Sequence, residues 1–333
     1  MRIALSMYPG LEGRALRPEH RATLAELGDV LDLTSLNDLP EDRADEVLAQ
    51  TDVLLAHWGC LPVDAALLAR APHLQMVAYA AGTVKDSIAP EVFEQGILVT
   101  SGAAANAVPV AEFTLAAILF AGKDVFGARE RLRADANPDL VWPVRRRPVG
   151  NLAKRIGLIG ASHVGRALIE LLRPFRLEVL LSDPYLDERT ATDLGVRRVE
   201  LDELLASSDV VSIHAPALPE TRHLIGAGEL ARMPDAATLI NTARGSLVDH
   251  EALTAELRTG RLHAVLDVTD PEPLPDDHEL LRLPNAFVTP HLAGSQGTEL
   301  TRMAELVLEE IRRFGAGEPP LHPVRGADLG RIA

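Results

Sequence analysis

One segment specifies the architecture of this chain most strongly: Arg155-Ile156-Gly157-Leu158-Ile159-Gly160-Ala161-Ser162-His163-Val164-Gly165. Residues 155–159 form an apolar, β-prone run, and the glycine turn Gly160–Gly165 follows it. Apolar residues at helical spacing then continue to Leu172, and a second β-prone run ends at Asp183. A strand, a glycine turn, a helix, a strand and an acid make up the βαβ unit that binds the adenosine half of a dinucleotide.

The residues of this turn predict which cofactor it binds. Gly160 permits the tight turn, and Gly165 lets the helix pack closely on the strand, so that the helix N-terminus faces the pyrophosphate. Asp183 lies 23 residues after Gly160, close to the ~20 residues expected for the acid that binds the ribose hydroxyls. Because a carboxylate there repels a 2′-phosphate, we predict NAD rather than NADP. Ser162 stands where glycine is usual; its hydroxyl can bond a phosphate, but its Cβ reduces the clearance. An ordinary α/β turn is the alternative interpretation.

The composition is typical of a soluble globular protein. Of the 333 residues, 47% are hydrophobic and 24% are charged, and this length allows two domains with cores of their own. A formal charge of −15 disfavours a nucleic acid or an anionic membrane as a partner, and we expect no metal site. Cys60 is the only cysteine, so no intrachain disulfide is possible and a cytoplasmic location is expected. The most apolar segment, residues 108–121, contains Glu112 and is too short to span a bilayer.

The rest of the chain alternates β-prone and helix-prone segments, which predicts an α/β fold with two doubly wound parallel sheets. In the first hundred residues the expected strands are Ile3–Ser6, Val30–Leu33, Val53–Ala56, Met76–Ala80 and Ile97–Thr100. A helical pattern runs from Asn106 toward Arg133, and residues 134–154 predict a loop. The alternation resumes after Asp183. It ends in an amphipathic helix marked by Leu300, Met303, Ala304, Val307, Leu308 and Ile311.

Three segments beyond the glycine turn each follow an expected strand, which is where open α/β sheets bind ligands. Asn241–Gly245 contains Arg244, whose planar guanidinium can bind a carboxylate. A proline-rich loop presents Glu272, and His291 follows the last strand. Each residue alone is explained as well by a surface or structural role. Together, a carboxylate clamp, an acid that orients a histidine and the histidine itself are what the reduction of a 2-oxo acid requires.

These segments resemble the D-isomer-specific 2-hydroxyacid dehydrogenase family over nearly the whole chain. The resemblance rests on the glycine turn with Asp183, Ile213-His214-Ala215-Pro216 with Thr221, Asn241–Gly245, Asp267-Val268 through Glu272-Pro273, Thr289-Pro290-His291, and Asn106 with Val110-Ala111-Glu112. It implies an NAD-dependent reductase of the glyoxylate or hydroxypyruvate type. In such an enzyme Arg244 would hold the substrate, His291 would transfer the proton, and Glu272 would orient His291 and favour its imidazolium form.

The resemblance also implies further site residues and a domain arrangement. Ala81, Gly82 and Thr83 would bind the substrate carboxylate, and Trp58 would line the side-chain pocket. The cofactor would contact Gly160, Ser162, His163, Val164, Gly165, Asp183, Ala215, Pro216, Thr221, Thr242, Ala243, Asp267 and Gly294. A Rossmann NAD-binding domain, residues 102–294, would be inserted in a flavodoxin-like substrate domain of residues 1–101 and 295–333. Two copies would form a homodimer through the cofactor domains.

The sequence departs from the family pattern at two further places, and two other functions are alternatives to this interpretation. Residues 262–267 make a strand one residue shorter than usual, which leaves the aim of Asp267 open, and Ala80–Asp86 lacks the usual second glycine. A place in the hydrophobic core is the alternative role of Trp58, and the sequence favours it over the pocket wall. A formate-dehydrogenase-like enzyme is one alternative, although its family has glutamine in place of Glu272. An NAD(H)-sensing regulator without enzymatic activity is the other.

Overall fold

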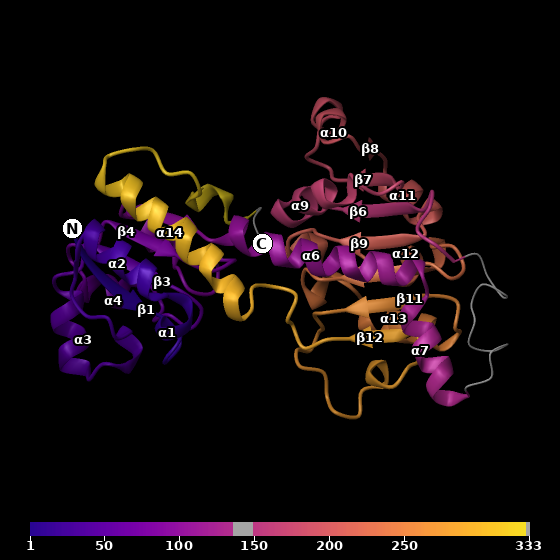
Figure 1. The fold of residues 1–333 in the computed structure, drawn as a ribbon, viewed down its shortest axis with the longest axis horizontal. Helices are drawn as coiled ribbons and strands as arrows, with labels where there is room; N and C mark the ends of the chain where they lie inside the picture. Colours follow the sequence, from indigo (N-terminus) through magenta and orange to yellow (C-terminus); the bar gives the residue numbers. More distant parts are fainter. Residues whose placement is uncertain (136–148, 331–333) are drawn as a thin grey trace. The chain divides into compact units, whose positions relative to one another are not determined.

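The computed structural model describes residues 1–135 and 149–330. The loop expected over residues 134–154 therefore lies largely outside the described residues. The chain divides into two compact units, Met1–Asn106 with Ser295–Ala333, and Ala107–Gly294. Each unit is an α/β structure built on its own sheet, in which all or nearly all neighbouring strands are parallel (Figure 1). This confirms the predicted fold class.

The first unit contains a six-stranded sheet. Its strands are β1 (Arg2–Ser6), β2 (Asp29–Val30), β3 (Val53–Ala56), β4 (Met76–Tyr79), β5 (Leu98–Ser101) and β13 (Pro323–Val324), in the order β13-β5-β4-β3-β1-β2. The neighbouring pairs are parallel except that β13 lies antiparallel to β5. The order 2-1-3-4-5 of the first five strands is that of a flavodoxin-like sheet.

Helices cover both faces of this sheet, because successive residues of each buried strand point to opposite sides. Leu54 of β3 packs in one hydrophobic cluster and Leu55 in the other. The helices are α1 (Glu12–Ala15), α2 (Pro18–Leu27), α3 (Glu41–Leu48), α4 (Ala65–Arg70), α5 (Pro90–Glu94) and α14 (Leu300–Gly315). Helix α14 buries Met303, Val307 and Ile311 in the same cluster as Leu55, so the C-terminal part of the chain completes the core of the first unit.

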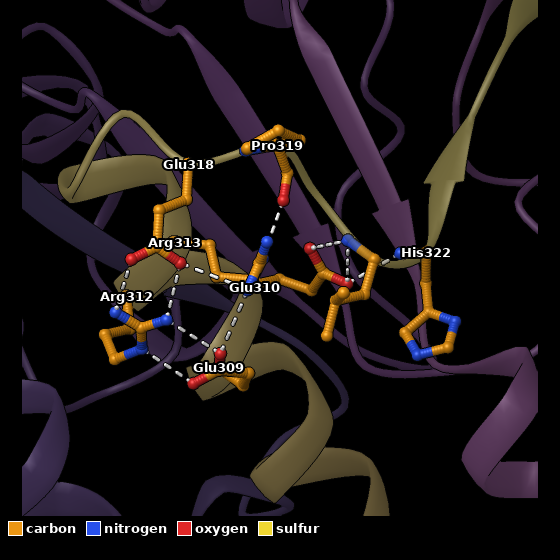
Figure 2. Close-up of polar contacts among 8 residues, drawn as sticks. Glu309, Glu310, Arg312, Arg313, Glu318, Pro319 and His322 are labelled. Carbon is orange, nitrogen blue, oxygen red and sulfur yellow. Dashed lines mark hydrogen bonds and ion pairs between the residues drawn. The ribbon is translucent and has the colours of Figure 1, made fainter.

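A buried carboxylate ties the segment after α14 to the helix (Figure 2). Glu310 is 1% exposed and accepts hydrogen bonds from the backbone N–H groups of Leu321 and His322, at 2.7–3.1 Å. On the solvent side, Arg312 bridges Glu318 and Glu309. These bonds turn the chain back so that β13 pairs with the edge strand β5.

The second unit contains a seven-stranded sheet in which every pair of neighbours is parallel. Its strands are β6 (Arg155–Ile159), β7 (Glu178–Ser182), β8 (Arg197–Arg198), β9 (Val210–Ile213), β10 (Thr238–Asn241), β11 (His263–Leu266) and β12 (Ala286–Val288). The order β12-β11-β10-β9-β6-β7-β8 is that of a Rossmann fold, and it reverses between β6 and β9. A dinucleotide binds such a sheet beyond the carboxyl ends of its strands.

Two hydrophobic clusters fill the two faces of this sheet. The helices are α6 (Ala103–Gly122), α7 (Val125–Ala134), α9 (His163–Leu172), α10 (Glu188–Leu194), α11 (Leu201–Ser207), α12 (Ala227–Arg232) and α13 (His250–Arg258). Residues of α6 and α9 pack in one cluster with Ile240 of β10, whereas α11, α12 and α13 pack in the other with Leu239. Helix α9 thereby directs its first turn toward the carboxyl end of β6.

The long helix expected from Asn106 to Arg133 is instead two helices. Helix α6 ends at Gly122, and α7 begins at Val125 after Asp124, which has a left-handed φ of 55°. Among the described residues, α6 is long and apolar enough to cross a membrane by length and composition alone. The helix is longer than the apolar segment that the sequence indicated, residues 108–121. A core helix passes the same test, and α6 buries Ala111, Ala117 and Ile118 in the second unit.

Candidate active site

The glycine turn lies at the carboxyl end of β6, and its two glycines are required by the backbone around them. Gly160 has a φ of +99°, and a Cβ there would lie 2.8 Å from the carbonyl oxygen of His214. A Cβ on Gly165 would lie 2.3 Å from the carbonyl oxygen of Gly160. Larger residues would therefore separate α9 from the turn, and the N-terminus of this helix would lose the position from which it can bind a phosphate.

Ser162, the departure from the usual glycine, is the N-cap of α9. Its Oγ accepts a hydrogen bond from the N–H of Gly165 at 3.3 Å, as serine does at many helix N-termini. His163 and Val164 form the start of the first turn of α9, where N–H groups have no partner within the helix itself. The cap therefore stabilises the helix end that the sequence assigns to the pyrophosphate.

Asp183 directly follows β7 and is hydrogen-bonded to the glycine turn. Its Oδ2 accepts from the N–H of Ala161 at 2.7 Å, and its Oδ1 accepts from the N–H of Tyr185 at 2.8 Å. These two bonds hold a half-buried carboxylate beside Gly160. The acid and the turn together fit the adenosine half of NAD, with the acid at the ribose.

The other residues predicted to bind the cofactor follow the neighbouring strands at the same edge of the sheet. Ala215 and Pro216 come after β9, and the Thr221 hydroxyl stabilises their loop by donating to the carbonyl of Pro216 at 2.7 Å. Thr242 and Ala243 come after β10. The Thr242 hydroxyl lies 3.1 Å from that of Thr114 on α6. The sheet therefore brings together the strand ends that carry these residues.

His291 and Glu272 form a direct pair. Nδ1 of His291 and Oε1 of Glu272 lie 2.5 Å apart, and the two side chains are 48% and 41% exposed. Glu272 belongs to the loop after β11 and His291 to the loop after β12. Because Glu272 bonds Nδ1, Nε2 is the ring nitrogen that can exchange a proton with a ligand that reaches this surface.

Arg244 follows β10 and is half-buried. Its Nη1 donates to the carbonyl of Ala243 at 2.7 Å, and the side chain of Asn241 donates to the Arg244 carbonyl at 2.8 Å. The next residue, Gly245, lies against the loop that leads to Glu272, since a Cβ on it would be 2.0 Å from the carbonyl oxygen of Thr269. The loops that carry Arg244 and Glu272 are therefore in direct contact.

Asp267 is the residue at the end of β11, and its side chain is 1% exposed. Its Oδ1 accepts from the Thr289 hydroxyl at 2.6 Å and from the N–H of Leu292 at 2.9 Å. Its Oδ2 accepts from the N–H of Ala293 at 2.8 Å. The carboxylate thus bonds the segment on both sides of His291. That segment ends at Gly294, the last residue of the second unit.

Two histidines at strand ends are held neutral by burial. His214 follows β9 directly beneath the glycine turn and is 4% exposed, and burial lowers its pKa to about 4. In the first unit, burial likewise lowers the pKa of His57, which follows β3, to about 4. At neutral pH neither ring adds positive charge to its site.

The residues predicted to bind the substrate from the first half of the chain lie in the first unit. Ala81, Gly82 and Thr83 form the loop after β4, and the Ser101 hydroxyl fixes this loop by donating to the carbonyl of Gly82 at 2.7 Å. Trp58 follows β3, is half-buried, and packs against the hydrophobic clusters on both faces of the sheet. Trp58 therefore contributes to the core. This is one of the two roles considered from the sequence, the other being the wall of the substrate pocket.

Two hydroxyl groups of the site were not singled out by the sequence. Thr114 reads as one more residue of the apolar face of α6, and nothing in its spacing indicates the bond to Thr242. Thr289 belongs to the segment Thr289-Pro290-His291 that carries the family resemblance. The sequence signal that could have drawn attention to Thr289 is its place directly before Pro290 and His291, the candidate acid.

Comparison with known proteins identifies the family. Residues 115–293 match the family described as D-isomer specific 2-hydroxyacid dehydrogenase, NAD binding domain. Glyoxylate reductase of Korarchaeum cryptofilum is 34% identical over 265 residues, which cover 78% of each chain. D-3-phosphoglycerate dehydrogenase of Methanocaldococcus jannaschii is 29% identical over 304 residues, 90% of this chain and 57% of that protein. The chain thus spans little more than half the length of this second relative.

A solved structure shows the same fold. The D-isomer specific 2-hydroxyacid dehydrogenase from Lactobacillus delbrueckii ssp. bulgaricus, in its NAD-complexed form, aligns with 98% of this chain and 100% of its own, with a TM-score of 0.80 at 23% identity. The predicted family and the predicted cofactor, NAD, are both confirmed. The chain therefore belongs to the D-isomer-specific 2-hydroxyacid dehydrogenase family, and it is an NAD-dependent oxidoreductase that acts on the CH–OH group of its donors.

Proposed function

We propose that this chain reduces a small 2-oxo acid of the glyoxylate or hydroxypyruvate type with NADH, and oxidises the corresponding D-2-hydroxy acid in reverse. The observation that carries the proposal is the pair of His291 and Glu272, 2.5 Å apart at the carboxyl edge of the sheet that bears the glycine turn. An imidazole oriented by a carboxylate is suited to proton transfer at an oxygen atom. Similarity to the glyoxylate reductase of K. cryptofilum supports a small substrate.

Each of the three site residues has a separate role in this reaction. Glu272 holds Nδ1 of His291, so Nε2 donates the proton to the substrate oxygen during reduction and takes it back during oxidation. The guanidinium of Arg244 binds the substrate carboxylate through two parallel hydrogen bonds. Bound NADH supplies the hydride that reduces C2.

We also assign the substrate-facing roles of the first unit. Backbone N–H groups around Ala81, Gly82 and Thr83 bind the carboxylate, in the loop whose conformation Ser101 fixes. Trp58, half-buried after the neighbouring strand β3, borders the substrate side chain. Because β3 and β4 are neighbours in the sheet, their loops begin at the same edge.

We further propose a homodimer that forms through the second unit, and a cytoplasmic location. Phe120 and Phe287 are 49% and 36% exposed. Phe126 lies against both rings, at centroid distances of 5.9 and 4.5 Å. A cluster of three phenylalanine rings that is partly exposed at the surface supports contact with a second copy of this chain. Light scattering of the purified chain should give the mass of a dimer, and a monomeric mass would contradict this assignment.

A substrate panel tests the proposed reaction. Glyoxylate, hydroxypyruvate and pyruvate are each mixed with NADH, formate is mixed with NAD⁺, and the absorbance of NADH is followed. We expect glyoxylate or hydroxypyruvate to consume NADH. The variant His291→Ala should lower kcat by about 10²–10⁴-fold and leave the NADH Kd unchanged, whereas His73→Ala, at an exposed histidine, should have no effect. Unchanged turnover in His291→Ala would exclude it as the acid.

The same panel separates the alternatives. Formation of NADH from formate alone would support a formate-dehydrogenase-like enzyme, which Glu272 in place of glutamine disfavours. Flat traces with every 2-oxo acid, together with measurable NADH binding, would support an NAD(H)-sensing regulator.

A further inference from the structure

We propose that Thr114 of α6 is a positioning residue, whose hydroxyl group holds the segment Asn241–Gly245 so that Arg244 points in the direction needed to bind the substrate carboxylate. This inference rests on the proposed function in that Arg244 is taken as the residue that binds this carboxylate. The site residues implied by the family resemblance do not include Thr114. Its role is to hold another residue of the site, Thr242, and not to contact a ligand itself.

The hydrogen bond between the two threonines has a defined direction. Oγ1 of Thr114 and Oγ1 of Thr242 lie 3.1 Å apart, and the two residues are 0% and 8% exposed. A hydroxyl group carries a single proton, and Thr114 donates its proton to the carbonyl of Val110, one turn earlier in α6, at 2.7 Å. Thr242 is therefore the donor, and the oxygen of Thr114 is the acceptor that fixes the direction of the Thr242 side chain.

Helix α6 gives this acceptor a fixed place in the core of the second unit. Thr114 lies in the middle part of the 20-residue helix. The helix buries Ala111 and Ile118 in the same hydrophobic cluster as Ile240, which belongs to β10 and directly precedes Asn241. The bond from Thr242 to Thr114 therefore ties the loop after β10 to a packed helix, so the loop is held to the core.

Asn241 keeps the shape of the segment, and the direction of Arg244 depends on how the segment as a whole is placed. The Asn241 side chain donates to the carbonyl of Arg244 at 2.8 Å and accepts from the N–H of Ala243 at 3.0 Å. Nη1 of Arg244 donates to the carbonyl of Ala243 at 2.7 Å, so the guanidinium follows the peptide group directly after Thr242. A rotation of the chain at Thr242 would therefore redirect the guanidinium.

The variants Thr114→Val and Thr114→Ser test the proposal. Valine has nearly the same shape as threonine but leaves the buried Thr242 hydroxyl without its acceptor, so this side chain turns to find another one. With NADH saturating, we expect the KM for the 2-oxo acid to rise by about 10-fold, as small displacements of binding groups cause. The kcat should change by less than about threefold, because the carboxylate is bound in the ground state and in the transition state alike.

Two further measurements separate the role of the hydroxyl from that of the side-chain shape. Thr114→Ser keeps the hydroxyl and should restore the KM to within about twofold of the wild type. Amide hydrogen exchange of residues 242–245 should be faster in Thr114→Val than in the wild type, in the absence of any ligand. An equal rise of the KM in both variants would overturn the assignment to the hydroxyl.

Thr254→Val is the matched control. Thr254 of α13 is 7% exposed, and its hydroxyl donates to the carbonyl of His250, one turn earlier in the same helix, at 2.6 Å. This is the bond that Thr114 makes to Val110, in a helix that does not hold the Arg244 segment. Thr254→Val should therefore lower the Tm and leave the KM unchanged.

The variant Thr242→Val removes the same bond from its other side, and it replaces Thr114→Val if that variant does not fold. The double variant should raise the KM no further than Thr242→Val alone, because the bond is lost only once. Additive effects, or an unchanged KM in Thr114→Val or its replacement, would overturn the proposal. A wild-type chain inactive toward every 2-oxo acid would refute the proposed function, whereas the hydrogen exchange of residues 242–245 would still decide the role of Thr114.

Discussion

Lowering the pH from 7 to 5 should destabilise both units through their buried histidines. His214 is 4% exposed and His57 is 1% exposed, and burial lowers the pKa of each from the usual 6.5 to about 4. The unfolded chain gains a proton on each ring near pH 6.5, but the folded chain does so only near pH 4. The stability is therefore complete above pH 6.5 and is lost as the pH falls toward 4, because the unfolded state binds more protons in this interval.

The size of the loss follows from the same two pKa values. At pH 5 the unfolded ring is almost fully protonated and the folded ring almost fully neutral, which corresponds to about 2 kcal/mol of unfolding free energy for each histidine. His57 belongs to the first unit and His214 to the second. The two losses can therefore be measured separately by removing one histidine at a time.

Urea denaturation at pH 7 and pH 5 measures this effect. In His214→Gln, and separately in His57→Asn, the decrease in unfolding free energy between the two pH values should be about 2 kcal/mol smaller than in the wild type. The asparagine can still accept the hydrogen bond that Nδ1 of His57 accepts from the N–H of Trp58. His73→Gln, at an exposed position, is the control. A decrease of the same size in the variants and the wild type would refute the assignment of this pH dependence to buried neutral histidines.

Three further changes probe the binding residues. Gly160→Ala should raise the NADH Kd by at least about tenfold and lower the Tm, because its φ is +99° and the new Cβ would lie 2.8 Å from the His214 carbonyl oxygen; an unchanged Kd in a titration would contradict this close packing. Asp183→Ala should reduce the preference for NADH over NADPH, since the carboxylate that repels a 2′-phosphate is gone. A ratio of the NADPH Kd to the NADH Kd that is the same in the variant and the wild type would count against this role of Asp183. Arg244→Lys should raise the KM for the 2-oxo acid by about 10–100-fold, because lysine cannot form two parallel hydrogen bonds, and steady-state kinetics with an unaltered KM would remove Arg244 from substrate binding.

The sequence predicts the parts of the fold that follow local patterns. Val53–Ala56 is found with the predicted bounds, because a short apolar run between helical segments has a clear periodicity. β13 was not predicted, since Pro323–Val324 has no pattern of its own and pairs with β5 only where Glu310 holds the preceding residues. The break between α6 and α7 was missed for a related reason. The helical spacing of the apolar residues continues past Asp124, and only the left-handed backbone of this residue ends one helix and starts the next.

The site likewise contains features that follow local sequence patterns and others that depend on tertiary packing. Arg244, Glu272 and His291 could be singled out as candidates because each follows a strand, and the topology brings the ends of parallel strands to one edge. The cap formed by Ser162 was not predicted, because the sequence was interpreted only in terms of a bond from this hydroxyl to a phosphate, although serine directly before a helix is a common N-cap. The partners of Asp267 were not readable, because its three donors come from residues 289–293, whose path depends on the packing of β12 beside β11.

The placement of α14 has a consequence for synthesis on the ribosome. Met303, Val307 and Ile311 fill the core around β1 and β3, although nearly two hundred residues of the second unit separate them from those strands in the chain. All strands of the Rossmann sheet have been translated before α14 emerges, so the inserted unit can fold on the nascent chain first. Until then, only residues of the N-terminal segment such as Ala15 of α1 and Leu24 of α2 cover this face of the N-terminal strands. This half of the enzyme is therefore the one that chaperones would need to protect.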